Sequence, residues 1–131
     1  MVKIILIAHG DMAKAMLDTA AKIMSFDTRS VDTYSVNGKV DFDSLSTRLK
    51  NSFDGKNGTL ILADIFGGTA CNISAGLSHG AKNVNVVCGF NLNMLLSALN
   101  HRGTLGIKAL AAKVSEDGVK GIINVTEKLG K

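Results

Sequence analysis

The sequence contains no proline and no tryptophan, and only 5% of its residues are aromatic. It also lacks a long hydrophobic run, because its most apolar segments, residues 4–8 and 60–63, are far shorter than the about 20 residues of a membrane-spanning helix. The N-terminus lacks the design of a signal peptide, since Lys3 leads directly into strand-like residues and no cleavage site follows. These absences argue against a membrane-spanning or secreted protein and predict a cytoplasmic one.

Cysteine is scarce, and the spacing of Cys71 and Cys88 matches no metal-binding motif. We therefore expect two reduced, buried thiols, no metal and no cofactor. The net charge is +4, but the positive residues are dispersed along the second half of the chain and no basic cluster is interleaved with aromatic residues. The sequence thus argues against nucleic-acid binding.

Apolar residues make up 46% of the 131 positions, which is enough for a single domain spanning residues 1–131. Apolar runs alternate with segments of helical periodicity. Strands are predicted at Val2–Ile7, Val31–Val36, Thr59–Ala63 and Val84–Val87. Helices are predicted at 12–24, 42–53, Thr69–Leu77, Leu92–Leu99 and Leu105–Val119. Continuous apolar strands indicate an α/β fold with an open, mainly parallel, doubly wound sheet of flavodoxin-like order, and "GIINV" at 121–125 predicts a short C-terminal edge strand.

Two strands of this predicted sheet end on residues that can carry chemistry. His9 follows the first strand and Asp64 follows the third, and in the flavodoxin-like order these strands are neighbours at the switch point where ligands bind. Gly67 and Gly68 allow close backbone approach, Thr69 adds a hydroxyl, and the helix N-termini that follow favour an anion. A carboxylate bonded to one ring nitrogen leaves the other as a nucleophile, so the pattern indicates reversible phosphorylation of histidine.

Each of these residues also has an ordinary structural interpretation. A histidine at a strand end is often only a hydrogen-bonded structural residue, and Asp64 could simply cap a turn. Only the joint placement of His9, Asp64 and residues 67–69 favours a functional site. His79 and His101 lie near helix ends, where a cation suits the helix dipole, and we expect both at the surface. Asp11 is expected to be an N-cap that turns away from His9.

Three segments carry a resemblance to a known family. "IILIAHGDMAKAM", "LILADIFGGTACNIS" and "VVCGFNLNMLLSAL" resemble, in order and spacing, segments of the enzyme IIA component of the mannose-type (mannose/fructose/sorbose) sugar phosphotransferase system, or PTS. The resemblance covers essentially the whole chain and implies a single PTS EIIA type-4 (mannose-family) domain. It implies that His9 is phosphorylated, that Asp64 orients it, and that Gly67, Gly68 and Thr69 line the phosphoryl site. The chain departs from the family's common Ser-Pro-Phe at Thr69, Ala70 and Cys71.

The resemblance also implies partners. The donor would be phospho-HPr, the acceptor the IIB component of the same transporter, and the membrane IIC and IID components would be reached indirectly. The family commonly exchanges its last strand between subunits, so residues 121–125 would build a homodimer. Three alternatives remain open: a regulatory module, the related subunit of dihydroxyacetone kinases, and a non-catalytic small-ligand binding domain. The chain ends at Lys131 without a partner domain, which favours the free carrier.

Overall fold

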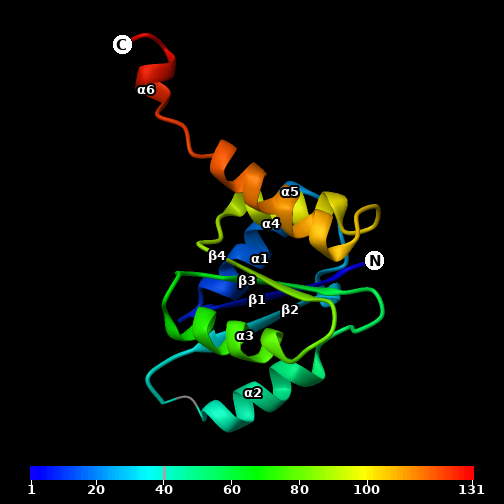
Figure 1. Ribbon diagram of the computed structural model, residues 1–131. Coiled ribbons are helices and arrows are strands. Elements are labelled where there is room, and N and C mark those ends of the chain that lie inside the picture. The colour runs from blue at the N-terminus through cyan, green and yellow to red at the C-terminus, as the bar shows by residue number, and fades with distance from the viewer. Residues whose placement is uncertain (40) are drawn as a thin grey trace.

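The computed structural model describes residues 1–39 and 41–131. Its four strands are β1 (Lys3–His9), β2 (Val31–Val36), β3 (Thr59–Ala63) and β4 (Val84–Cys88). They form one parallel sheet in the order β2-β1-β3-β4 (Figure 1). The predicted α/β fold of flavodoxin-like order is confirmed, and the ends of β1 and β3 are neighbours, as the site prediction requires.

Helices cover both faces of this sheet (Figure 1). One face carries α1 (Met12–Ile23), α4 (Leu92–His101) and α5 (Ile107–Lys120), whereas the other carries α2 (Phe42–Asn51) and α3 (Thr69–His79). Side chains of β1 alternate between the two cores: Ile4 and Leu6 join the first, and Ile5 and Ile7 join the second. Because the side-chain period of a strand is two, a strand covered on both faces must be apolar throughout. A short 3-10 helix, Thr28–Ser30, precedes β2.

Among the described residues, no helix is both long enough and apolar enough to cross a membrane. Asp41 caps α2, since its side chain accepts hydrogen bonds from the N–H groups of Asp43 and Ser44 at the start of this helix. Asp11 occupies the N-cap position of α1, but its side chain makes no capping bond. Its φ of −94° and ψ of 7° lie outside the extended region that caps usually adopt.

The predicted strand at 121–125 is absent from this single chain. Residues 122–124 have no regular structure and lead to a short helix, α6 (Val125–Lys128), which lies apart from the sheet (Figure 1). The segment is apolar and exposed, with Ile122 77% exposed. A strand needs a neighbour to satisfy its backbone groups, and α5 carries this segment away from the sheet.

The expectation of two separate thiols is wrong. Cys71 in α3 and Cys88 at the end of β4 form a disulfide with a Cα–Cα distance of 6.3 Å. Cys71 is buried, as expected, whereas Cys88 is half-buried. The spacing of the two cysteines along the chain does not reveal this pairing, because the pairing depends on how α3 packs beside β4.

Candidate functional site

His9 and Asp64 meet at the ends of two neighbouring strands. His9 is the last residue of β1, and Asp64 directly follows β3. The Nδ1 atom of His9 lies 2.7 Å from Oδ2 of Asp64, and the backbone N–H of His9 donates to the same oxygen at 2.9 Å. The His9 side chain is 51% exposed, whereas that of Asp64 is only 10% exposed. The carboxylate thus lies beneath an imidazole that faces solvent.

The charge of Asp64 determines which ring nitrogen of His9 carries a proton. Burial by itself would raise the pKa of Asp64, but hydrogen bonds from the His9 backbone and ring and from the N–H of Ile65 outweigh it and lower the pKa below 3.8. Asp64 is therefore ionised at neutral pH and can only accept hydrogen bonds. Nδ1 must be the donor, and a neutral ring then has its lone pair on Nε2. That atom is a nucleophile on the exposed side of the ring.

The segment after Asp64 turns sharply toward the helix α3. Gly67 adopts φ +83°, a left-handed conformation that other residues rarely take. Its carbonyl accepts a hydrogen bond from the side chain of Asn72 at 3.1 Å. Gly68 packs so closely that a Cβ there would lie 2.7 Å from Ile65 and 3.6 Å from Cε1 of His9. Both glycines are therefore required for this turn to pass beside the imidazole ring.

The N-terminus of α3 lies next to His9. The N–H of Gly68 is already used in a bond to the carbonyl of Ile65, so it is no free anion ligand. The N–H groups of Thr69 and Ala70, at the start of the helix, have no intrahelical partner. Thr69 and His9 line one cavity of about 230 Å³. A half-exposed nucleophile beside free N–H groups can accept and hold an anionic group such as phosphoryl.

The turn after β1 fixes the other side of the histidine. Gly10 adopts φ +59°, and its N–H donates to the carbonyl of Val36 at 3.3 Å. Its carbonyl accepts a hydrogen bond from Oγ of Ser35 at 2.7 Å. The end of β2 thereby holds the turn that directs the chain from His9 into α1.

Two asparagines at the site were missed in the sequence. Asn37 lines the cavity that contains His9 and Thr69, and Asn72 holds the carbonyl of Gly67. The strand order contained a signal for Asn37, because β2 is the other neighbour of β1 and Val36 pairs with His9. No local pattern marked Asn72, whose role depends on the geometry of the turn.

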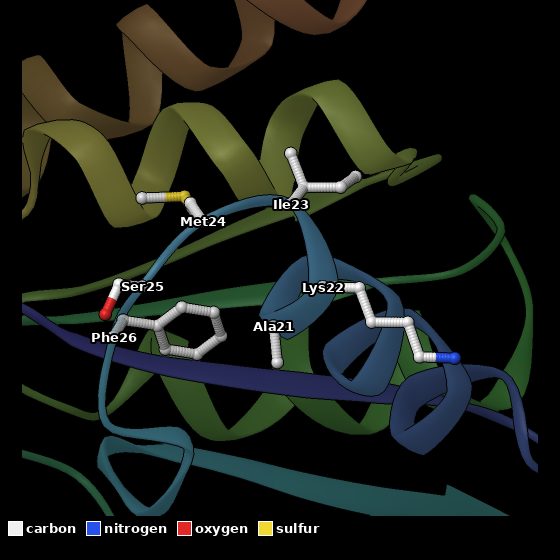
Figure 2. A pocket seen from close by; sticks show the side chains of 6 residues that line it. All are labelled: Ala21, Lys22, Ile23, Met24, Ser25 and Phe26. Atoms are coloured by element: carbon white, nitrogen blue, oxygen red, sulfur yellow. The ribbon is translucent and has the colours of Figure 1, made fainter.

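The other histidines lie away from this site. His79 is exposed and His101 is half-buried, each at a helix C-terminus. No cluster of potential metal ligands occurs within residues 1–39 and 41–131. A separate hollow of about 380 Å³ lies at the C-terminal end of α1, opposite the end that follows His9 (Figure 2). Its lining is Ala21, Lys22, Ile23, Met24, Ser25 and Phe26.

Comparison with known proteins gives a consistent result. The family model described as "PTS system fructose IIA component" matches residues 3–115. A sorbose-specific PTS EIIA component from Lacticaseibacillus casei is 27% identical over 129 residues, covering 97% of this chain and 93% of that protein.

Solved structures extend the comparison. The PTS component EIIA from Streptococcus agalactiae superposes with a TM-score of 0.88 at 27% identity, covering 97% of this chain and 99% of the other. The mannose/sorbose-specific IIA subunit from Enterococcus faecalis gives 0.80 at 26% identity, covering 94% and 93%. With the family model matching most of its length, the chain belongs to the mannose-type IIA components of the sugar phosphotransferase system, a phosphotransferase family.

Proposed function

We propose that this protein is a phosphocarrier that accepts a phosphoryl group from phospho-HPr on Nε2 of His9 and passes it to the IIB component of its transporter. The sugar then receives the group during uptake through the membrane IIC and IID components. The carrier works in the cytoplasm and needs neither metal nor cofactor. The observation that carries the proposal is the 2.7 Å hydrogen bond between Asp64 and Nδ1 of a half-exposed His9.

The transfer exchanges one phosphorus–nitrogen bond for another. The lone pair on Nε2 of His9 attacks the phosphorus of phosphohistidine on HPr, the bond to the donor nitrogen breaks, and the donor imidazole leaves with that electron pair. Because the two bonds are alike, the step is close to thermoneutral and reversible. The same geometry therefore serves the forward transfer to IIB.

The protein assists this step by orienting the His9 ring and by placing N–H dipoles beside the phosphoryl group. Asp64 keeps the proton on Nδ1 and stabilises the positive charge that develops on the ring as Nε2 forms its bond. Free N–H groups of Thr69 and Ala70 and the hydroxyl of Thr69 face the charge of the phosphoryl oxygens. Gly67 and Gly68 contribute by shape, because they let this helix start beside the ring.

An exposed apolar rim around His9 supports transfer between proteins. Phe66 is 87% exposed and Ile65 is 59% exposed, directly after Asp64. Met12 and Phe42, at the starts of α1 and α2, are also exposed. Large apolar side chains gathered at a reactive group are typical of a surface that docks a protein and excludes water. This rim favours a protein-to-protein carrier over a domain that binds a small ligand.

The test is phosphorylation in a reconstituted system. The protein is incubated with phosphoenolpyruvate, enzyme I and HPr, and its intact mass is measured. One acid-labile phosphoryl group is expected on the wild type, none on His9→Gln, and one on the control His79→Gln, whose exposed ring lies away from the site. Label that persists on His9→Gln would refute the assignment. Absence of label on the wild type in the complete mixture would favour the non-catalytic small-ligand binding domain instead.

We further propose that two copies assemble as a homodimer through the C-terminal segment. β4 is an edge strand of the described sheet, and the exposed segment 122–125, which carries the apolar Ile122, Ile123 and Val125, has no strand partner among the described residues. An open edge and an unpaired apolar segment in one chain fit reciprocal pairing between two copies. Each would cover the backbone groups that the other leaves free.

The dimer is tested by light scattering coupled to size exclusion at micromolar concentration. Truncation after Gly121 keeps α5 whole and removes the segment, so a dimeric wild type and a monomeric truncation are expected. Ile122→Asp should also give a monomer, whereas Thr126→Asp adds the same charge on the exposed α6 and should not. A monomeric wild type, or a truncation that still dimerises, contradicts the proposal.

A further inference from the structure

The disulfide links the proposed phosphoryl site to the edge of the sheet. Cys71 lies in the first turn of α3, shortly after Thr69, and Cys88 is the last residue of β4. Cys88 also pairs with Ala63, the residue directly before Asp64. The bond therefore joins the helix start that faces the phosphoryl group to the strand that flanks the carboxylate.

The start of α3 packs against the sheet through small side chains. The fully buried residues of this helix are the small side chains of Ala70, Cys71 and Ser74. Within the described residues, the buried hydroxyl of Ser74 has no hydrogen-bond partner. Ile73 and Leu77 are only partly buried. Since small side chains bury little apolar area, the disulfide adds a covalent link to a modest apolar contact.

Cys88 is the sulfur that a small molecule reaches first. Cys71 is only 5% exposed, whereas Cys88, at the end of β4, is half-buried. Access decides which sulfur of a disulfide is attacked, so exchange begins at Cys88.

We propose that Cys71 and Cys88 form a reversible redox modification site whose substrates are small thiols and disulfides, and that its oxidation state sets the rate of phosphoryl transfer at His9. This inference rests on the proposed phosphocarrier function. In a cytoplasm that keeps most thiols reduced, a cysteine pair near a reactive histidine suits a redox sensor better than a permanent structural disulfide.

The chemistry is thiol–disulfide exchange. A small thiolate attacks the sulfur of Cys88, a mixed disulfide forms there, and the sulfur of Cys71 leaves as a thiolate that takes up a proton. A second small thiolate attacks the sulfur of the small molecule in the mixed disulfide and releases Cys88, which is protonated in turn. The two small thiols become one small disulfide, and the protein disulfide becomes two thiols. Oxidation by a small disulfide is the reverse.

The oxidised form is the faster carrier. With the bond in place, the N–H groups of Thr69 and Ala70 stay aligned beside His9 before the phosphoryl group arrives, and preorganised donors cost no reorganisation during transfer. Reduction frees the first turn of α3 from β4. We expect about tenfold slower transfer, the lower end of what loss of an orienting contact costs.

The test compares two redox states of the same protein. The wild type is treated with glutathione disulfide or with dithiothreitol, desalted without air, and its thiols are counted by alkylation and mass. Each form then reacts with purified phospho-HPr in a single turnover, with enzyme I removed. Cys88→Ser receives both treatments, and circular dichroism verifies its fold.

We expect no free thiol and fast transfer in the oxidised wild type, two thiols and slow transfer in the reduced wild type, and one slow rate for Cys88→Ser after either treatment. Equal rates for the two wild-type forms would overturn the redox proposal while leaving phosphorylation of His9 intact. Two free thiols counted in the wild type after treatment with glutathione disulfide would also overturn the redox proposal. Absence of phosphorylation in both forms would refute the phosphocarrier function itself, and the redox control with it.

Discussion

Replacing Asp64 by asparagine tests the link between geometry and transfer most directly. The carboxylate accepts three hydrogen bonds: Oδ2 from the N–H and Nδ1 of His9 at 2.9 and 2.7 Å, and Oδ1 from the N–H of Ile65 at 2.9 Å. Asparagine has nearly the same shape but one acceptor oxygen and one NH₂ donor. If the asparagine oxygen faces His9, its NH₂ group faces the N–H of Ile65, and the hydrogen bond from Ile65 is lost. If it is flipped, both bonds to His9 are lost.

The effect on stability follows from this count. Hydrogen bonds to a charged group contribute about 1.5–3 kcal/mol and neutral ones about 0.5–1.5 kcal/mol, so neutralising two of them and losing the third costs a few kcal/mol at full burial. His9 is half exposed, and water compensates part of this loss. We expect about 2 kcal/mol. For 131 residues, an unfolding entropy of about 2.1 cal/mol/K per residue converts this to a fall in Tm of about 7 °C.

Asp64→Asn should change the rate of phosphoryl transfer proportionally more than it changes the stability. Without the carboxylate, the proton is no longer held on Nδ1, and the positive charge that forms on the ring loses its counter-charge. Loss of a carboxylate that orients a functional histidine slows its chemistry by about 10–100-fold. Single-turnover transfer from phospho-HPr, followed by rapid quenching and intact mass, measures this rate. Thermal unfolding followed by circular dichroism measures Tm on the same samples.

Asp18→Asn is the matched control. Asp18 is an exposed carboxylate of α1 that pairs with Lys14 at 2.8 Å, so its replacement removes the same charge away from His9. An exposed pair of this kind contributes about 0.3–0.5 kcal/mol, and transfer should stay at the wild-type rate. If Asp64→Asn transfers as fast as Asp18→Asn, the carboxylate has only a structural role and the orientation argument is refuted.

Four further predictions follow from the described contacts. Burial raises the pKa of Asp64, but hydrogen bonds from His9 and Ile65 outweigh burial and lower this pKa below 3.8. The ionised carboxylate therefore stabilises the fold above pH 3.8, and this stability is lost as the pH falls below that value. The difference in Tm between the wild type and Asp64→Asn should close in that acidic range. Leu62→Ala, at a fully buried position of β3, should lower the free energy of unfolding by about 2–5 kcal/mol in urea titrations. Gly67→Ala, at φ +83°, should cost about 1–2 kcal/mol and slow single-turnover transfer, and an unchanged rate would contradict the role of this turn. Cys88→Ser should lower stability by about 3 kcal/mol relative to the oxidised wild type, because the disulfide spans 17 positions, and should match the reduced wild type in urea.

Local patterns in the sequence predicted most of the sheet and its helices. The apolar run that ends at His9 and the run at Thr59–Ala63 are strands of the structure, as predicted. These features depend on neighbours along the chain, since periodicity and caps act over one or two turns. The topology rule for parallel sheets then predicted the meeting of His9 and Asp64 at the switch point.

The C-terminal segment shows where such reasoning fails. "GIINV" has the composition of a strand, yet residues 122–124 have no regular structure in the single chain. Strand propensity expresses packing against neighbours, and this segment has no neighbouring strand among the described residues. A second copy is the neighbour that we propose for it.

Within the site, the amino-acid order already specifies which reactive side chains follow which strand. Three contacts follow only from the folded arrangement: Cys71 with Cys88, Asn72 with the carbonyl of Gly67, and Asn37 with the cavity of His9. The reason is the difference in how far along the chain the interacting residues lie. Periodicity and capping depend on residues a few positions apart, whereas these contacts depend on ångström-scale distances between elements that are set by the packing of both cores against the sheet.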